Sequence, residues 1–140
     1  MAVTYLLDTS AYWRIQRDEG VRKSWAREIV QGAVALTEPT RHEILYSARN
    51  GSERLEMAAT LDGLFPRAAF STGLWEWIDA VQQQLAERSR RGAGVIDLML
   101  AAVAVRDDLI ILNDDKDFAA VASVIPEVKQ VRVLQSPDSA

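Results

Sequence analysis

The chain has 140 residues, of which 49% are hydrophobic and 26% charged, and this composition predicts one folded globular domain rather than a disordered or fibrous chain. The absence of cysteine excludes disulfides, zinc–thiolate sites and cysteine nucleophiles. The formal net charge of −4 at pH 7 disfavours a protein that binds nucleic acid through a basic surface of its own.

The start of the chain predicts a strand, two helices and a second strand. Residues 3–7 are rich in β-forming side chains, and the polar residues 8–10 are of the types that cap a helix over 11–17. A second helix is expected over 21–30, and the short apolar run 33–36 predicts a buried strand. A strand that passes directly into a helix is typical of an α/β fold.

The next segment predicts two helices and a strand. Pro39 favours a helix that starts at Thr37 or Glu38 and runs to about residue 49, because proline is tolerated in a first turn. Asn50 and Gly51 are expected to end it. Another helix is predicted over 53–64, followed by a short strand within 65–70.

The clearest helical pattern follows, with a cap expected at Ser71 or Thr72. Its apolar residues recur at helical spacing and are Leu74, Trp77, Ile78, Val81 and Leu85. Residues 95–105 are apolar almost all round, as in a helix buried on most sides.

The end of the chain predicts a buried strand, a helix and a last strand. Residues 109–112 form a continuous apolar run, which is typical of a central parallel strand. Asp115 or a neighbour is expected to cap a helix to about residue 125, and 131–134 closes the sheet.

Strands and helices alternate, so we expect an α/β three-layer sandwich with a mainly parallel central sheet flanked by helices. Residues 1–135 are predicted to form this single domain, and 136–140 a frayed tail.

Acidic residues follow two of the predicted strands. Asp8 comes after the first strand, and Asp114, Asp115 and Asp117 come after 109–112. In such sheets ligands bind beyond the carboxyl ends of the strands, so these acids are expected at one crevice. Asp97 stands at the start of the buried helix and could join them.

Taken singly, each acid has a structural explanation, because aspartate commonly caps a helix or pairs with its dipole. Converging carboxylates raise one another's pKa unless a cation lies between them. Hard divalent cations prefer such oxygen ligands, so the pattern favours a magnesium-type site that acts on a phosphodiester. A metal-dependent nuclease would also tolerate the net negative charge, since the cations supply positive charge.

Other chemistries lack their residues. His42 is the only histidine, which excludes two-histidine RNA cleavage and histidine-rich zinc sites. Residues 92–94 do not complete a dinucleotide loop. Tyr12 and Trp13 could stack bases but more often such residues pack in a core. The basic residues of 88–91 could contact phosphates or form a solvated helix end.

Four segments together resemble the PIN-domain family, and within it the VapC toxins of bacterial toxin–antitoxin pairs. They are residues 5–11 (YLLDTSA), 37–43 (TEPTRHE), 95–104 (VIDLMLAAVA) and 112–118 (LNDDKDF). The segments occur in the family's order and cover essentially the whole chain.

The resemblance implies a divalent-metal endoribonuclease that depends on Mg²⁺ or Mn²⁺. The residues that match the family's acids are Asp8, Glu43, Asp97 and then Asp115 or Asp117, with Asp8, Asp97 and Asp115 as the expected metal ligands. Glu43 enters on the resemblance alone, and Asp114 becomes a capping or surface residue. The resemblance also implies an RNA substrate, a small antitoxin partner, and a homodimer or a toxin–antitoxin hetero-oligomer.

Three alternatives remain at this point: a solitary RNA-processing PIN nuclease, a receiver-like phosphoacceptor domain, and a catalytically silent binding domain. A receiver would need an acceptor aspartate after a middle strand, and neither 33–37 nor 65–70 ends in one.

No apolar run approaches the roughly 18 residues that span a membrane. Residues 1–4 lack the basic start of a secretory signal, so a cytoplasmic protein is expected.

Overall fold

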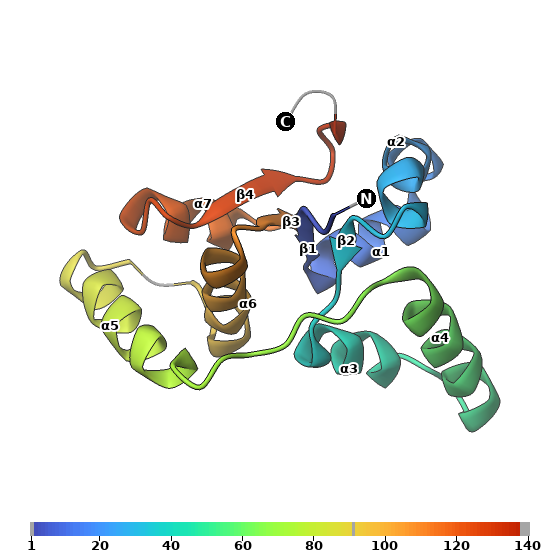
Figure 1. The fold of residues 1–140 in the computed structure, drawn as a ribbon, viewed down its shortest axis with the longest axis horizontal. Helices are drawn as coiled ribbons and strands as arrows, with labels where there is room; N and C mark the ends of the chain where they lie inside the picture. The colour runs from blue at the N-terminus through green and yellow to red at the C-terminus, as the bar shows by residue number, and fades with distance from the viewer. Residues whose placement is uncertain (1, 91, 138–140) are drawn as a thin grey trace.

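A four-stranded parallel sheet lies at the centre of the computed structural model, which describes residues 2–90 and 92–137 (Figure 1). Its strands are β1 (Tyr5–Leu7), β2 (Val34–Ala35), β3 (Ile110–Asn113) and β4 (Lys129–Arg132). Their order across the sheet is β2-β1-β3-β4, and every neighbouring pair is parallel. The carboxyl ends of β1 and β3 therefore lie side by side.

The described residues also form seven helices. They are α1 (Thr9–Arg17), α2 (Glu19–Val30), α3 (Glu38–Tyr46), α4 (Gly51–Leu64), α5 (Leu74–Glu87), α6 (Val95–Asp107) and α7 (Lys116–Val124). Strands β1 and β3 pass into α1 and α7 through turns of one or two residues. The side chains of those turns are thus fixed at the edge of the sheet.

The two faces of the sheet are covered by different helices. Leu6 and Ile111 pack in one apolar cluster with α5, α6 and α7. Tyr5, Leu7 and Leu112 point the other way, into a second cluster built with α1 to α4. This alternation follows from the period of two in a strand, and it confirms the predicted three-layer α/β sandwich.

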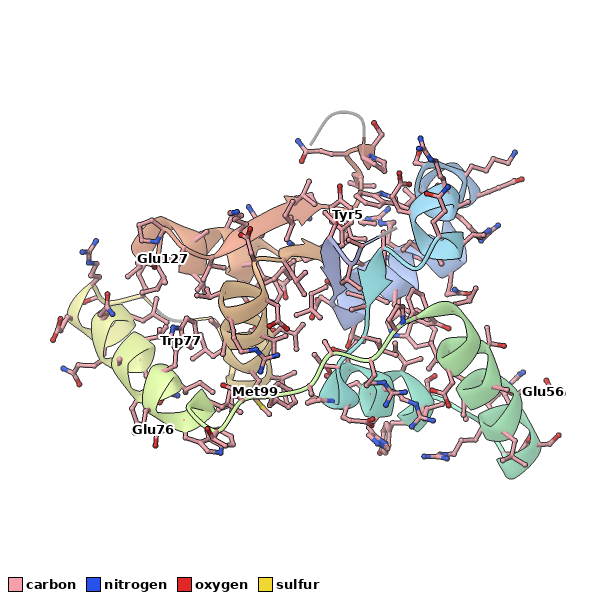
Figure 2. The ribbon with its side chains drawn as sticks, viewed as in Figure 1. Tyr5, Glu56, Glu76, Trp77, Met99 and Glu127 are labelled. Carbon is pink, nitrogen blue, oxygen red and sulfur yellow. The ribbon has the colours of Figure 1, made fainter. Side chains whose placement is uncertain are left out.

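Helix α5 buries the predicted apolar stripe. Leu74, Ile78, Val81 and Leu85 are buried, and Trp77 packs against the same cluster between α5 and α6, whereas Glu76 lies exposed (Figure 2). The expected Ser71 or Thr72 cap is wrong, because α5 starts after Gly73 with no side-chain cap. Apolar burial, rather than a cap, stabilises this helix.

Two further boundaries differ from the prediction. Residues 65–70 form only an isolated bridge between Leu36 and Arg67, because Pro66 has no N–H to extend a ladder. Asn50 does not end α3, which stops at Tyr46; its side chain instead accepts from the Glu53 N–H and caps α4. Residues 50–51 therefore mark the start of α4 rather than the end of α3.

Of the predicted tail, residues 138–140 lie outside the described part of the chain, while Ser136 and Pro137 are partly buried. No helix among the described residues is long and apolar enough to cross a membrane.

Candidate functional site

Asp8 is fixed at the carboxyl end of β1. Its backbone N–H donates to Leu112 O at 3.0 Å, which joins the ends of β1 and β3. Its side chain is 6% exposed and caps α1, accepting from the Ser10 N–H at 3.1 Å and from the Ser10 hydroxyl at 2.5 Å. Because both bonds reach the same oxygen, Oδ2, they orient the carboxylate.

Three further carboxylates meet at the neighbouring strand end. Asp97, Asp115 and Asp117 each offer an oxygen, and these oxygens lie within 4.8 Å of one another. Asp115 caps α7 and Asp117 lies in the first turn of that helix, while Asp97 comes from the first turn of α6. We refer to Asp97, Asp115 and Asp117 as the carboxylate cluster.

Asp97 is the most perturbed member of the cluster. Burial and the carboxylates of Asp8, Asp115 and Asp117 together raise its pKa to about 6, against a hydrogen bond from the Gly94 N–H. Asp8 is therefore close enough to act on the cluster electrostatically. Repulsion of this kind is relieved when a cation binds.

The pKa of Asp8 is also raised, mainly by burial and further by the Glu43 carboxylate, although hydrogen bonds from Ser10 and Thr9 oppose the shift. Glu43 is exposed on α3, and its Oε1 accepts from the Thr9 hydroxyl at 2.9 Å. Glu43 thus lies beside Asp8 but is not one of the three clustered acids. The apolar pattern of this helix alone did not predict that Glu43 faces the carboxyl ends of the strands.

Two uncharged side chains hold the acids in place, and neither was predicted to have this role. The Ser10 hydroxyl accepts from the Asp114 N–H at 2.9 Å while it donates to Asp8, so it links the turns after β1 and β3. The fully buried Asn113 accepts from the Asp115 N–H at 3.0 Å and donates to Val131 O at 3.2 Å. The only available signal was a polar residue at a strand end.

Asp114 is neither a cap nor a surface residue, which corrects the prediction. Its side chain is 7% exposed and accepts from Arg14 Nε at 2.9 Å and from an Arg132 amino group at 3.0 Å. Burial by itself would raise the pKa of Asp114, but these hydrogen bonds and the two positive charges outweigh it and lower the pKa. Asp114 therefore neutralises arginines instead of joining the cluster.

The other singled-out residues take structural places. His42 is exposed and lies 3.2 Å from Glu38 on α3. Tyr12 is buried and packs edge-to-face with Trp13, which is partly buried against the same apolar cluster.

The donor set fits a hard divalent cation. Its members offer only carboxylate oxygens, which magnesium and manganese prefer, and the crowding of negative charge gives a cation a favourable place to bind. No histidine belongs to the set, which makes zinc a poor match.

Comparison with known proteins identifies the family of the chain. Residues 5–124 match the PIN domain family model. Among characterised proteins, the chain is 36% identical over 124 residues to ribonuclease VapC51 of Mycobacterium tuberculosis, covering 89% of each chain. It is 31% identical over 120 residues to ribonuclease VapC6 of the same species, covering 85% of this chain and 94% of the relative.

Solved structures show the same fold at low sequence identity. VapBC-1 from nontypeable Haemophilus influenzae aligns with a TM-score of 0.76 and 12% identity, over 95% of this chain and all of the other. VapBC2 from Rickettsia felis, solved with a fragment of promoter DNA, aligns with a TM-score of 0.74 and 12% identity, over 93% and 98% of the two chains. The chain belongs to the PIN domain family, among the VapC proteins.

Proposed function

We propose that the protein is a metal-dependent endoribonuclease that acts as the toxin of a toxin–antitoxin pair. The observation that carries the proposal is the carboxylate cluster, in which oxygens of three acids lie within 4.8 Å of one another; burial and the neighbouring carboxylates raise the pKa of Asp97. Folded proteins rarely retain such repulsion between carboxylates unless a bound cation offsets it.

Asp97, Asp115 and Asp8 would hold Mg²⁺ or Mn²⁺. When bound, the ion would lower the pKa of a coordinated water and stabilise negative charge on the phosphate oxygens. Ser10 keeps the Asp8 carboxylate oriented, and the Gly94 N–H does the same for Asp97. Asp117 and the exposed Glu43 are the remaining carboxylates that could accept a proton from water at this edge.

RNA is the proposed substrate, because relatives that share about a third of the sequence over most of their length are named ribonucleases. A small antitoxin is the proposed partner, since VapBC assemblies share the fold. A cytoplasmic location and a homodimer or toxin–antitoxin hetero-oligomer complete the proposal. Membership of the PIN family removes the receiver-like alternative.

The test is cleavage of a structured RNA by the purified protein with Mg²⁺ or Mn²⁺, compared with Asp8→Asn and Asp97→Asn. Asparagine at position 8 still caps α1, so loss of cleavage would report the lost charge rather than a lost helix. Asp62→Asn is the matched control, because Asp62 is an exposed acid paired with Arg41 and Arg67. We expect both site variants to lose cleavage by roughly 100-fold, the upper end of what removing even a group that supports a metal ligand costs.

Cleavage that persists in both site variants, or in excess chelator, would contradict the mechanism. The toxin role has a separate test, which is growth arrest on expression and rescue by the product of a short reading frame directly upstream. Without arrest and without such a frame, a solitary RNA-processing nuclease becomes the better account. A folded protein that binds RNA and never cuts it would indicate a silent binding domain.

A further inference from the structure

A cavity of about 390 Å³ lies beside the carboxylate cluster, between the end of α5 and the start of α6. Its wall comes from three places: Gln82 and Leu85 on α5, Ser89, Arg90 and Gly92 in the connecting turn, and Leu98 on α6. The volume falls within the range of roughly 300–1,000 Å³ typical of small-molecule sites. The proposed hydrolysis does not use this cavity.

The turn that lines the cavity also reaches the carboxylate cluster. Leu98 of the cavity wall is buried and directly follows Asp97 in α6. Gly92 has a φ of +119°, and a Cβ placed on it would lie 2.8 Å from Asp117 Oδ1, so the backbone of the turn touches the carboxylate. A group seated in the cavity is therefore a neighbour of whatever reacts at the cluster.

Residues 88–90, at the end of α5, have a defined conformation. The Ser89 N–H donates to Ala86 O at 3.0 Å and the Arg90 N–H donates to Leu85 O at 2.8 Å, which is the Schellman pattern at the end of α5. Ser89 takes the left-handed position of this motif, with a φ of 53°, where glycine is usual. A non-glycine residue held in this conformation is often found at a functional position.

The polar side chains of the wall are free to meet a ligand. Among residues 2–90 and 92–137, the side chains of Gln82 and Arg90 have no hydrogen-bond or ion-pair partner, unlike those of Arg14, Arg41 or Arg106. Leu85 and Leu98 supply the apolar part of the wall. This mixture of an apolar wall and unpaired polar side chains suits an unpaired nucleobase, which has an apolar face and a hydrogen-bonding edge.

We propose that this cavity binds one unpaired base of the RNA next to the scissile phosphate, and that Gln82 and Arg90 read the edge of that base. The inference rests on the proposed ribonuclease function and adds the determinant of its sequence preference. Single-stranded bases are recognised in general by stacking combined with hydrogen bonds to their edges. Because the cavity lies beside the cluster, its occupant would be the base of a nucleotide that flanks the cut.

The experiment uses the full chain with Mg²⁺ and an RNA pool in which a single-stranded segment is randomised, and the cut ends are sequenced. Gln82→Ala and Arg90→Ala test the cavity. Gln83→Ala and Arg88→Ala are the matched controls, since they change the same residue types on the same helix end without lining the cavity. Circular dichroism verifies that every variant is folded.

We expect the wild type to prefer one base at a fixed position beside the cut. Each cavity variant should lower that preference about tenfold, which corresponds to one good base contact, while both controls keep it. A wild type with no base preference, or cavity variants that keep the full preference, would overturn the inference. A uniform loss at all sequences in Arg90→Ala would also overturn it, because that pattern indicates a phosphate contact.

The two levels of the proposal fail in different ways. Absence of cleavage by the wild type, or cleavage unaffected by Asp97→Asn, would contradict the ribonuclease function itself. Cleavage that depends on Asp97 but has a preference independent of Gln82 and Arg90 would leave the nuclease in place and remove only the base pocket.

Discussion

Asp97 is the residue whose folded environment most opposes the ionised form that a metal ligand needs. Burial and the carboxylates of Asp8, Asp115 and Asp117 raise its pKa to about 6, against an ordinary value of 3.8. A raised pKa in an acid means that the folded state favours the protonated form. The stabilising contribution is fully present below about pH 4 and is lost as the pH rises through 6.

Asp97→Asn should therefore stabilise the metal-free protein at pH 7.5 and have little effect at pH 4. The gain should be about 1 kcal/mol, because solvent screens part of the shift at a half-buried group. Urea unfolding in chelator at the two pH values measures the difference. An equal effect at both pH values would show that Asp97 does not titrate in this range.

Asp114 shows the opposite sign. Its pKa is lowered despite its burial, because Arg14 and Arg132 hydrogen-bond the charged form. The stability it contributes is present above its ordinary pKa of 3.8 and is lost as the pH falls below that value. The positions of these partners, 100 and 18 residues away along the chain, explain why the sequence did not reveal the burial of Asp114.

Asp114→Asn should destabilise the protein by about 2 kcal/mol at pH 7, less than for a fully buried pair because both arginines reach solvent and can be rehydrated. The difference should shrink as the pH falls below 4. Urea midpoints at pH 7 and pH 3 provide the measurement. A variant as stable as the wild type at pH 7 would mean that this ion cluster has no net effect on stability.

At the scale of helices and strands, the polar capping residues were the most useful signals for where helices begin. Caps were expected within residues 8–10 for α1 and at Asp115 or a neighbour for α7, and the capping residues are Asp8 and Asp115. The failed boundaries have local causes: Pro66 reduces a predicted strand to one bridge, and α5 begins without a side-chain cap. Periodicity located the helices because each buries one face, but it could not choose between a helix start and a helix stop at Asn50.

Asn50 provides a test of capping far from the carboxylate cluster. Its Oδ1 accepts from the Glu53 N–H at 2.8 Å at the start of α4. Asn50→Ala should lower the free energy of unfolding by about 1 kcal/mol, without changing the Mg²⁺ dependence of cleavage. Asn50→Asp, which can still cap, is the control and should keep wild-type stability.

At the scale of the whole molecule, the parallel order β2-β1-β3-β4 brings distant segments to one edge. It places Asp8 beside the turn that carries Asp115 and Asp117, and α6 adds Asp97 from a third segment. Strand-end reasoning predicted this convergence for Asp8 and for the acids after β3. It could not place Glu43, which depends on how α3 packs on α1, nor the supporting roles of Ser10 and Asn113.

The central claim is that these converging carboxylates hold a divalent cation. Its most direct test is an anomalous difference map from crystals soaked in Mn²⁺, recorded for the wild type and for Asp97→Asn. We predict a peak bounded by the carboxylates of Asp8, Asp97 and Asp115 in the wild type, and its loss in the variant. A wild-type map without a peak there, or a peak unchanged by Asp97→Asn, would contradict the account.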